Sequence, residues 1–137
     1  LPASLLARPI FTIRCYVKYK YVNTHPVFLS ASGDLLFSQV GSGKVQIRTN
    51  YGDYATASFT APTEDVWHEM YICVDMTNQS LDVYFDGSLA STSELESSMD
   101  DWGTPSADLY VAYVHANVAG RYIAVDDLRI YDEIVTP

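Results

Sequence analysis

Paired carboxylates are the first side chains in this sequence that could do chemistry. Groups of acidic residues that stand close together include Glu64-Asp65, Glu94 with Glu96, Asp100-Asp101 and Asp126-Asp127. Retaining hydrolysis of a glycosidic bond needs two carboxyl groups about 5 Å apart. A strand would supply them as Glu-x-Asp-x-Glu or Glu-x-Asp-x-x-Glu, and neither run occurs. Neighbouring strand residues point to opposite faces, so Asp126 and Asp127 are not expected to form such a pair.

Nucleophilic and metal-assisted chemistry have no better candidates. The histidines are His25, His68 and His115, and no Gly-x-Ser-x-Gly segment accompanies them. We expect His68 to be a half-buried structural residue, and Gly41-Ser42-Gly43 to be a hairpin turn rather than a phosphate-binding loop. No His or Cys residues have the spacing of a metal site. The sequence therefore predicts that the chain is not an enzyme.

Aromatic residues are the strongest candidates for binding. The chain has 11 tyrosines and 2 tryptophans. Exposed aromatic rings stack on the C–H faces of sugars, and Tyr, Trp and Arg are also enriched in protein interfaces. Most tyrosines are expected to pack within strands. The ligand contacts that we predict in loops at one edge of the molecule are Tyr51, Tyr54, Trp102 and Arg121.

Length and charge narrow the class of partner. The chain has 137 residues, enough for one domain over residues 1–137, and a net charge of -9. Nucleic acids and anionic membrane surfaces would repel it, whereas cations, neutral glycans or basic protein patches would not. No stretch reaches the ~18 apolar residues of a membrane-spanning helix, so we expect no membrane insertion. The sequence begins at Leu1 without a signal-like segment, which favours a domain excised from a larger protein.

Short strands must position these residues. Runs with alternating apolar and polar residues, rich in β-branched and aromatic side chains, are bounded by Gly, Asn, Asp, Ser or Pro. The expected strands are Phe11–Lys18, Val27–Leu29, Leu35–Val40, Lys44–Thr49, Ala55–Thr60, Trp67–Met76, Ser80–Phe85, Leu109–Val114 and Ile123–Tyr131. A polar stretch over residues 91–106 is the only long connection. This spacing predicts an all-β sandwich or jelly roll.

Four segments in order along the chain resemble laminin G-like and pentraxin-like domains of the concanavalin A-like superfamily. They are Phe11–Val17 (F-T-I…Y-V), Trp67–Ile72 (W-H-E-M-Y-I), Ser80–Gly87 (S-L-D-V-Y-F-D-G) and Val125–Tyr131 (V-D-D-L-R-I-Y). The resemblance covers nearly the whole chain. It implies a two-sheet antiparallel jelly-roll sandwich of the concanavalin A type and a role in recognition.

The resemblance also bears on the two cysteines and on the compartment. Pentraxins join cysteines in the corresponding strands, which implies a Cys15–Cys73 disulfide; two buried free thiols are the alternative. Closing a loop of about 58 residues would contribute roughly 4 kcal/mol in the chain-entropy model. Asn78-Gln79-Ser80 is an N-glycosylation sequon at an expected hairpin tip. Together these features predict an extracellular protein, either secreted or part of an ectodomain.

Asp126 raises the question of a metal ion. Alternation in the last strand places it on one face with Leu128 and Ile130. A carboxylate on an apolar face must be paired, hydrogen-bonded or bound to a metal. We expect a hydrogen bond between Asp126 and neighbouring loop backbone, because Arg121 would repel a cation. Relatives bind calcium near this strand, so the alternative that the resemblance implies is one structural calcium ion at Asp126.

The main functional hypothesis is a non-catalytic extracellular recognition or adhesion module that binds a glycan or a protein partner. Two alternatives remain open. One is a structural or assembly domain whose aromatic surface is covered by neighbouring domains or subunits. The other is a bacterial or viral carbohydrate-binding module in which the sequon is accidental and the cysteines are free.

Overall fold

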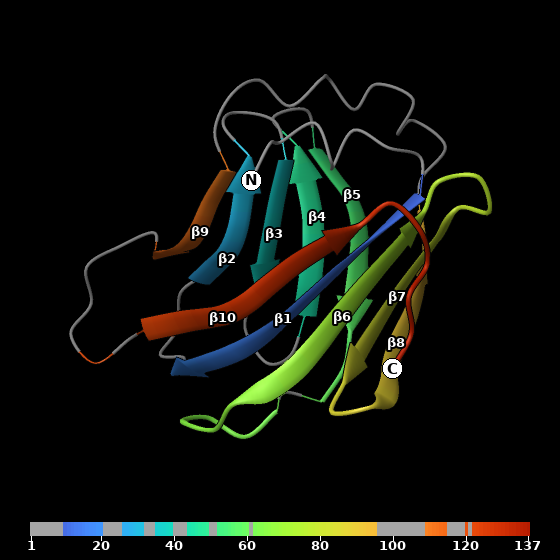
Figure 1. Cartoon of the computed structure of the whole chain (residues 1–137). Coiled ribbons are helices and arrows are strands. Elements are labelled where there is room, and N and C mark those ends of the chain that lie inside the picture. Colours follow the sequence, from blue (N-terminus) through green and yellow to red (C-terminus); the bar gives the residue numbers. More distant parts are fainter. Residues whose placement is uncertain are drawn as a thin grey trace.

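A computed structural model describes most of the chain (Figure 1). The described residues are 10–20, 26–31, 35–39, 44–49, 52–60, 62–95, 109–114, 120 and 122–137. Side-chain surroundings are described for 10–20, 57–60, 62–95, 120, 122 and 124–137.

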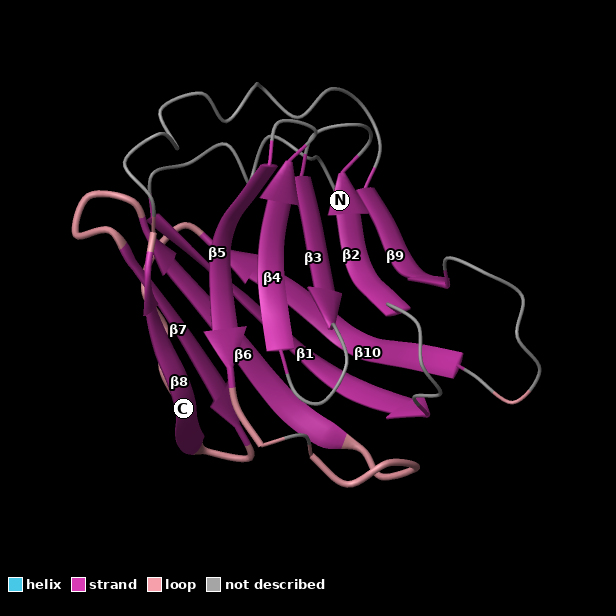
Figure 2. Ribbon diagram, turned by 180° about the vertical axis from the view of Figure 1, so that it is seen from behind, coloured by secondary structure: helices cyan, strands magenta, loops and turns pink. Residues whose placement is uncertain are grey.

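Ten strands, one more than the nine predicted, form two antiparallel sheets that face each other, and this two-sheet sandwich is the predicted fold (Figures 1 and 2). Sheet A has the strand order β10-β1-β6-β7-β8 and sheet B the order β5-β4-β3-β2-β9. No helix in the described part of the chain is long and apolar enough to cross a membrane. The strands are β1 (Ile10–Lys20), β2 (Pro26–Ala31), β3 (Leu35–Gln39), β4 (Lys44–Thr49), β5 (Gly52–Ser58), β6 (His68–Asp75), β7 (Ser80–Phe85), β8 (Ser88–Glu94), β9 (Leu109–Val114) and β10 (Tyr122–Tyr131).

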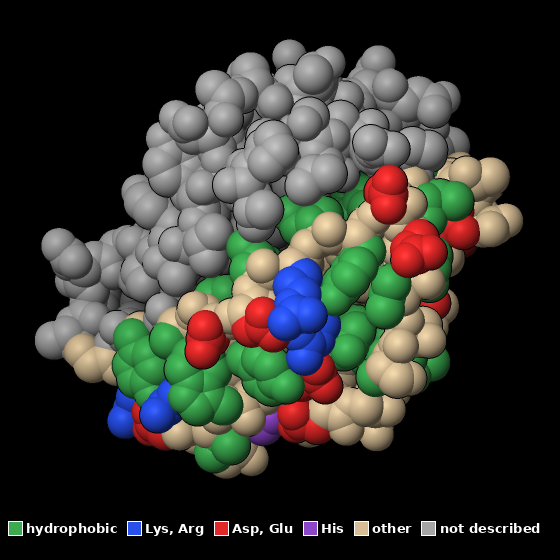
Figure 3. All heavy atoms as spheres, viewed as in Figure 1, with side chains coloured by type: hydrophobic (Ala, Val, Ile, Leu, Met, Phe, Trp, Pro, Cys, Tyr) green, Lys and Arg blue, Asp and Glu red, His purple; other side chains and the backbone are tan. Residues whose placement is uncertain are grey.

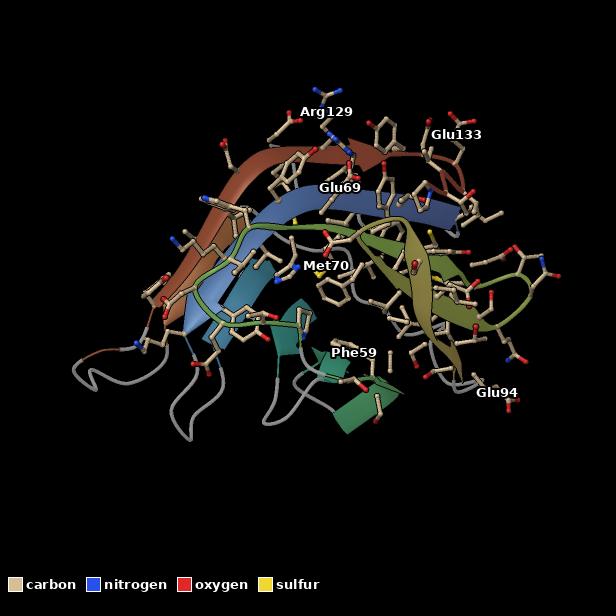
Figure 4. The ribbon with its side chains drawn as sticks, turned by 90° about the horizontal axis from the view of Figure 1, so that it is seen from below. Phe59, Glu69, Met70, Glu94, Arg129 and Glu133 are labelled. Atoms are coloured by element: carbon tan, nitrogen blue, oxygen red, sulfur yellow. The ribbon has the colours of Figure 1, made fainter. Side chains whose placement is uncertain are left out.

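The core lies between the sheets and follows the alternation of the sequence. Phe11, Ile13 and Cys15 of β1 are fully buried, and in β6 Ile72 and Val74 are as well. Met70 and Phe59 point into the space between the sheets, whereas Glu69 and Arg129 lie on the other side of sheet A (Figure 4). The apolar faces predicted for β1 and β6 are therefore confirmed.

A bulge in β10 reverses the predicted position of Asp126. Ile13 pairs with Ile130, but Tyr16 pairs with Asp126, so that two residues of β10 stand opposite Cys15. The first of these, Asp127, has a φ of 47°, in the left-handed region that such bulges use. One extra residue inverts the alternation of a strand. Asp126 is thus exposed on the outside of sheet A, and its expected place on the apolar face was wrong.

The two cysteines do not form the expected disulfide; both are free and buried. Cys15 pairs with Met70 and faces the core, whereas Cys73 pairs with Thr12 and faces the outside of sheet A. Cys73 lies three residues beyond Met70, on the order of 10 Å along the strand. Disulfides join Cα atoms less than about 7 Å apart. Opposite faces and this offset together explain why the expected pairing was wrong.

The residues after β10 cross the outside of sheet A. The Thr12 hydroxyl donates a hydrogen bond to the Glu133 carbonyl at 2.8 Å and accepts one from the Val135 backbone N–H at 2.9 Å. The Cys73 thiol donates to the Val135 carbonyl at 3.4 Å. Figure 1 shows this segment passing over the sheet toward β8, where the chain ends. It leaves Thr12 0% and Cys73 3% exposed.

Candidate functional site

The face of sheet A that points away from sheet B, here called the outer face, carries aromatic and charged side chains. Strand register places five tyrosines there: Tyr16, Tyr71, Tyr84, Tyr122 and Tyr131. Four of the chain's eight basic residues share this face: Arg14, Lys18, Lys20 and Arg129. Figure 3 shows basic side chains lying among acidic and apolar ones on it. The outer face therefore combines the side chains that recognise polar ligands with flat apolar rings.

One group on the outer face is the Arg14 cluster, formed by Arg14, Tyr16, Glu69, Tyr71 and Asp127. Arg14 Nε and Nη2 donate to Glu69 Oε1 at 2.9 and 2.6 Å, and Nη1 donates to Asp127 Oδ2 at 2.7 Å. The guanidinium lies 5.2 Å from the ring centre of Tyr16 and 5.9 Å from that of Tyr71. The cluster joins β1, β6 and β10 through charged hydrogen bonds, which are stronger than neutral ones.

The charges of this cluster stabilise one another. Hydrogen bonds to Glu69 and Asp127 raise the pKa of Arg14. The guanidiniums of Arg129 and Arg14 lower the pKa of Asp127. A general acid needs the opposite shift, a carboxyl whose pKa is raised toward neutrality. The Arg14 cluster is therefore suited to holding strands and a rigid surface, and not to proton transfer.

A second group, the Trp67 corner, lies where β1 ends and β6 begins. It consists of Lys18, Lys20, Asp65, Trp67 and Tyr122. Trp67 is 46% exposed. The β1–β6 pairing ends at Val17 with His68, so the next step along both strands brings Lys18 beside Trp67. Figure 3 shows apolar side chains gathered beside basic ones at one end of this face.

Asp65 organises the charges of the corner. Its carboxylate lies 3.3 Å from Lys20 Nζ and accepts a hydrogen bond from the Tyr122 hydroxyl. These partners, Tyr122 foremost, lower the pKa of Asp65, and Asp65 in turn raises the pKa of Tyr122 to about 12. Lys18 makes no ion pair with a residue that the structure describes. The charge of Lys18 also lowers the pKa of Asp65, but without a salt bridge the ammonium group can still approach a ligand.

Hydrogen bonds to neighbouring residues hold the segment that carries Trp67 in place. The Tyr19 hydroxyl donates to the Pro62 carbonyl at 2.6 Å, and the Asp65 backbone N–H donates to the Tyr19 carbonyl at 3.0 Å. His68 is more buried than the half-buried position expected, and it contacts Asp86 Oδ2 at 2.6 Å and the Thr63 carbonyl at 3.0 Å through its two ring nitrogens. These contacts hold the loop before β6 in one conformation.

The exposure of Trp67 was not predicted from the sequence. Its motif placed Trp67 inside a strand, and the structure begins β6 one residue later, at His68. The preceding acidic stretch Thr63-Glu64-Asp65 marks a loop, and Asp65 has a φ of 62°. That turn-forming stretch was the available signal that the tryptophan stands at the edge of the strand.

Three predicted ligand contacts, Tyr51, Trp102 and Arg121, lie outside the described residues, and only the backbone of Tyr54, in β5, is described. The strand directions of sheet B place the end of β4 and the start of β9 at the same end of that sheet. These are the attachment points of the connections that contain Tyr51 and Trp102. The connection that contains Arg121 leaves the other end of β9 and leads directly into Tyr122.

Asp126 and Asn78 are both exposed. Asp126 Oδ1 accepts a hydrogen bond from the Asp127 backbone N–H at 2.8 Å. The described residues contain no group of three or more His, Cys, Asp or Glu residues that could hold a metal ion, so a calcium site at Asp126 would need partners from elsewhere in the chain.

Asn78 lies in the turn between β6 and β7, where its backbone and side-chain N–H groups donate to Asp75 at 2.9 and 2.7 Å. Glycosylation at Asn78 stays a prediction.

Comparison with solved structures places this fold beside carbohydrate-binding proteins. The CBM40 domain of the Ruminococcus gnavus IT-sialidase superposes with a TM-score of 0.71 at 16% identity, covering 98% of this chain and 80% of that one. The same domain bound to α2,3-sialyllactose gives 0.70, over 94% of this chain and 78% of that one, also at 16% identity. A structure of botulinum neurotoxin type C, whose cell entry depends on interaction with two ganglioside molecules, gives a TM-score of 0.67 at 9% identity, over 93% of this chain and 33% of that one.

Sequence comparison gives the family. A comparison with curated protein sequences finds no match. The family model Laminin_G_3, described as the concanavalin A-like lectin/glucanases superfamily, matches residues 1–137. The resemblance carried by the four sequence motifs is thereby confirmed. The chain belongs to the concanavalin A-like lectin/glucanases superfamily.

Proposed function

We propose that this chain is a non-catalytic module that binds glycans outside the cell. The observation that carries the proposal is the fold match over 94% of the chain to a carbohydrate-binding module solved with α2,3- and α2,6-sialyllactose. The ganglioside-dependent neurotoxin supports the same class of ligand. The sequence alone left a glycan and a protein partner equally open, and these neighbours favour the glycan.

The chemistry of the outer face fits this class of ligand. A pyranose ring presents C–H groups that stack on aromatic rings, and hydroxyls that bind planar charged groups in pairs. Trp67 offers an exposed indole, and the rings of Tyr16 and Tyr71 lie beside the Arg14 guanidinium, which hydrogen bonds to Glu69 hold in place. Groups that are already fixed lose little freedom when a ligand binds, which favours affinity.

Further assignments are part of the proposal. Tyr51, Tyr54 and Trp102 would contact ligand near one end of sheet B, and Arg121 near the other. The exposed sequon at Asn78 supports passage through the secretory pathway. Because both cysteines are free, the extracellular location is proposed without the argument that a disulfide forms in an oxidising compartment. One structural calcium ion at Asp126 remains proposed only with ligands from outside the described residues.

A glycan array probed with the whole chain tests this function. The array carries neutral and acidic glycans, and each hit is confirmed by isothermal titration calorimetry. We expect saturable binding of at least one glycan and no change in its mass during incubation. If the chain binds no glycan and self-associates in analytical ultracentrifugation, the proposal is wrong and the chain is an assembly domain. If a bound glycan is hydrolysed, the chain is an enzyme.

A further inference from the structure

We infer that the Trp67 corner binds a carboxylate-bearing sugar residue. The juxtaposition that points to it is an exposed indole on a fixed loop beside an unpaired lysine. This inference rests on the proposed glycan-binding function and deepens it by naming the kind of sugar and the side chains that select it.

The indole supplies the apolar contact. Trp67 and its neighbour Val66 are each 46% exposed, among the few large apolar side chains in the described residues that reach the surface. Burying a tryptophan face contributes a large apolar area, and the indole N–H remains available as a donor. The loop beneath is held by Tyr19, Asp65 and His68, so Trp67 presents its ring without a prior ordering step.

Lys18 supplies the charge. Lys20 has its own counter-charge in Asp65 at 3.3 Å, and Tyr122 donates to that same carboxylate. Lys18 lies two residues earlier on the same face, about 7 Å away along β1, without an ion pair in the described part of the chain. A ligand carboxylate can therefore pair with Lys18 while its ring stacks on Trp67.

The net charge of the chain indicates that the ligand carries a single carboxylate rather than many negative charges. The chain carries -9, so its overall field repels extended anions such as nucleic acids or sulfated polymers. A single carboxylate meets only the local field of the corner, to which Lys18, Lys20 and Asp65 contribute two positive charges and one negative, because screening limits exposed charges to a range of about 8 Å. The corner thus fits a sugar acid, either a sialic acid or a uronic acid.

Titration calorimetry with the whole chain tests the inference. The probes are α2,3-sialyllactose, a glucuronate-terminated disaccharide, the methyl ester of each, and lactose. We expect at least one acid to bind about tenfold tighter than its methyl ester, as a charge-assisted contact requires, and the preference to shrink at high salt. The acid that shows the preference distinguishes a sialic acid from a uronic acid.

Variants assign the effect to the corner. Lys18→Met should reduce binding of the acid to the level of its ester, and Lys18→Arg should retain it. Arg129→Met removes one positive charge from the same outer face, away from Trp67, and should leave the preference intact. Trp67→Ala should abolish binding and Trp67→Phe should keep part of it, with circular dichroism verifying that both fold.

The outcomes separate the two proposals. Glycan binding with equal affinity for acid and ester, or an acid preference that survives Lys18→Met, would overturn the assignment of the Trp67 corner and leave the glycan-binding function standing. Binding of no glycan by the unchanged chain would overturn the glycan-binding function, and the assignment of the corner with it.

Discussion

Single side chains on the outer face decide how sheet A holds together, and Arg14 has the most contacts among them. Its side chain is 15% exposed and reaches Glu69 and Asp127 on two different strands. Without the guanidinium, the two carboxylates would face each other on one surface. A lysine cannot replace it, because an ammonium group lacks the planar fork that binds two acceptors at once.

We expect Arg14→Lys and Arg14→Met both to lower the melting temperature, Arg14→Met the more. Arg129→Met is the matched control, because Arg129 is 56% exposed and forms its salt bridge, at 2.9 Å, with Asp127 of its own strand. The control should shift the melting temperature by less than either Arg14 variant. Thermal unfolding followed by circular dichroism measures the difference, and equal shifts at Arg14 and Arg129 would contradict the role of the cluster.

Acid should weaken the fold through the carboxylates that accept hydrogen bonds. Arginine side chains lower the pKa of Asp127, and the N–H groups of Asn78 lower that of Asp75. A group with a lowered pKa stabilises the fold above its unfolded value, about 3.9 for Asp, and this stabilisation is lost as the pH falls further. Urea unfolding at a series of pH values should show the loss below about pH 4. Asp127→Asn and Asp75→Asn should each reduce its size.

At the scale of elements, the pairing of strands determines which side chains meet. Cys15 and Cys73 lie in adjacent strands, and the position of each in the alternation of its strand puts them on opposite faces of sheet A. Burial raises the pKa of Cys15 to about 12 and also raises that of Cys73. The C-terminal segment covers Cys73, whose thiol donates a hydrogen bond to the Val135 carbonyl.

Thr12→Val should therefore expose one thiol and not the other. The change keeps the shape of the side chain but removes both hydrogen bonds that hold Glu133 and Val135. We expect Cys73 to react faster with a thiol reagent in this variant, while Cys15 stays protected in the core. Mass spectrometry of peptides after timed alkylation measures both rates. Faster labelling of Cys15 instead would contradict the described faces.

The sequence predicted the regular elements well and the irregular ones poorly. Alternation placed Phe11, Ile13 and Ile72 in the core because strands of this sandwich bury one face. It failed at Asp126, since the alternation of residue types does not reveal that Asp127 adds an extra residue to the strand. It also missed β8, Ser88–Glu94, whose small polar residues resemble a loop. The motif put Trp67 inside a strand, because a motif does not say where a strand begins.

At the scale of the molecule, stability comes from the contact between the sheets. Ile72 is fully buried in the core, whereas Leu89 is 55% exposed on β8. We expect Ile72→Ala to reduce the free energy of unfolding by about 3 kcal/mol, through lost burial and the cavity that remains. Leu89→Ala, the matched control, should change it by less than about 0.5 kcal/mol. Urea unfolding monitored by tryptophan fluorescence measures both.

The bulge at Asp127 also affects how molecules behave toward one another. β10 is the last strand of sheet A and pairs with β1 on one side. A regular, flat strand in that position is a template on which a second copy can add a strand, and proteins blunt such edges with kinks and charges. Here the left-handed residue kinks the ladder and brings Asp126 and Asp127 to the same surface. A second copy approaching edge to edge would meet this kink and the exposed Asp126 carboxylate, which disfavours aggregation through this strand.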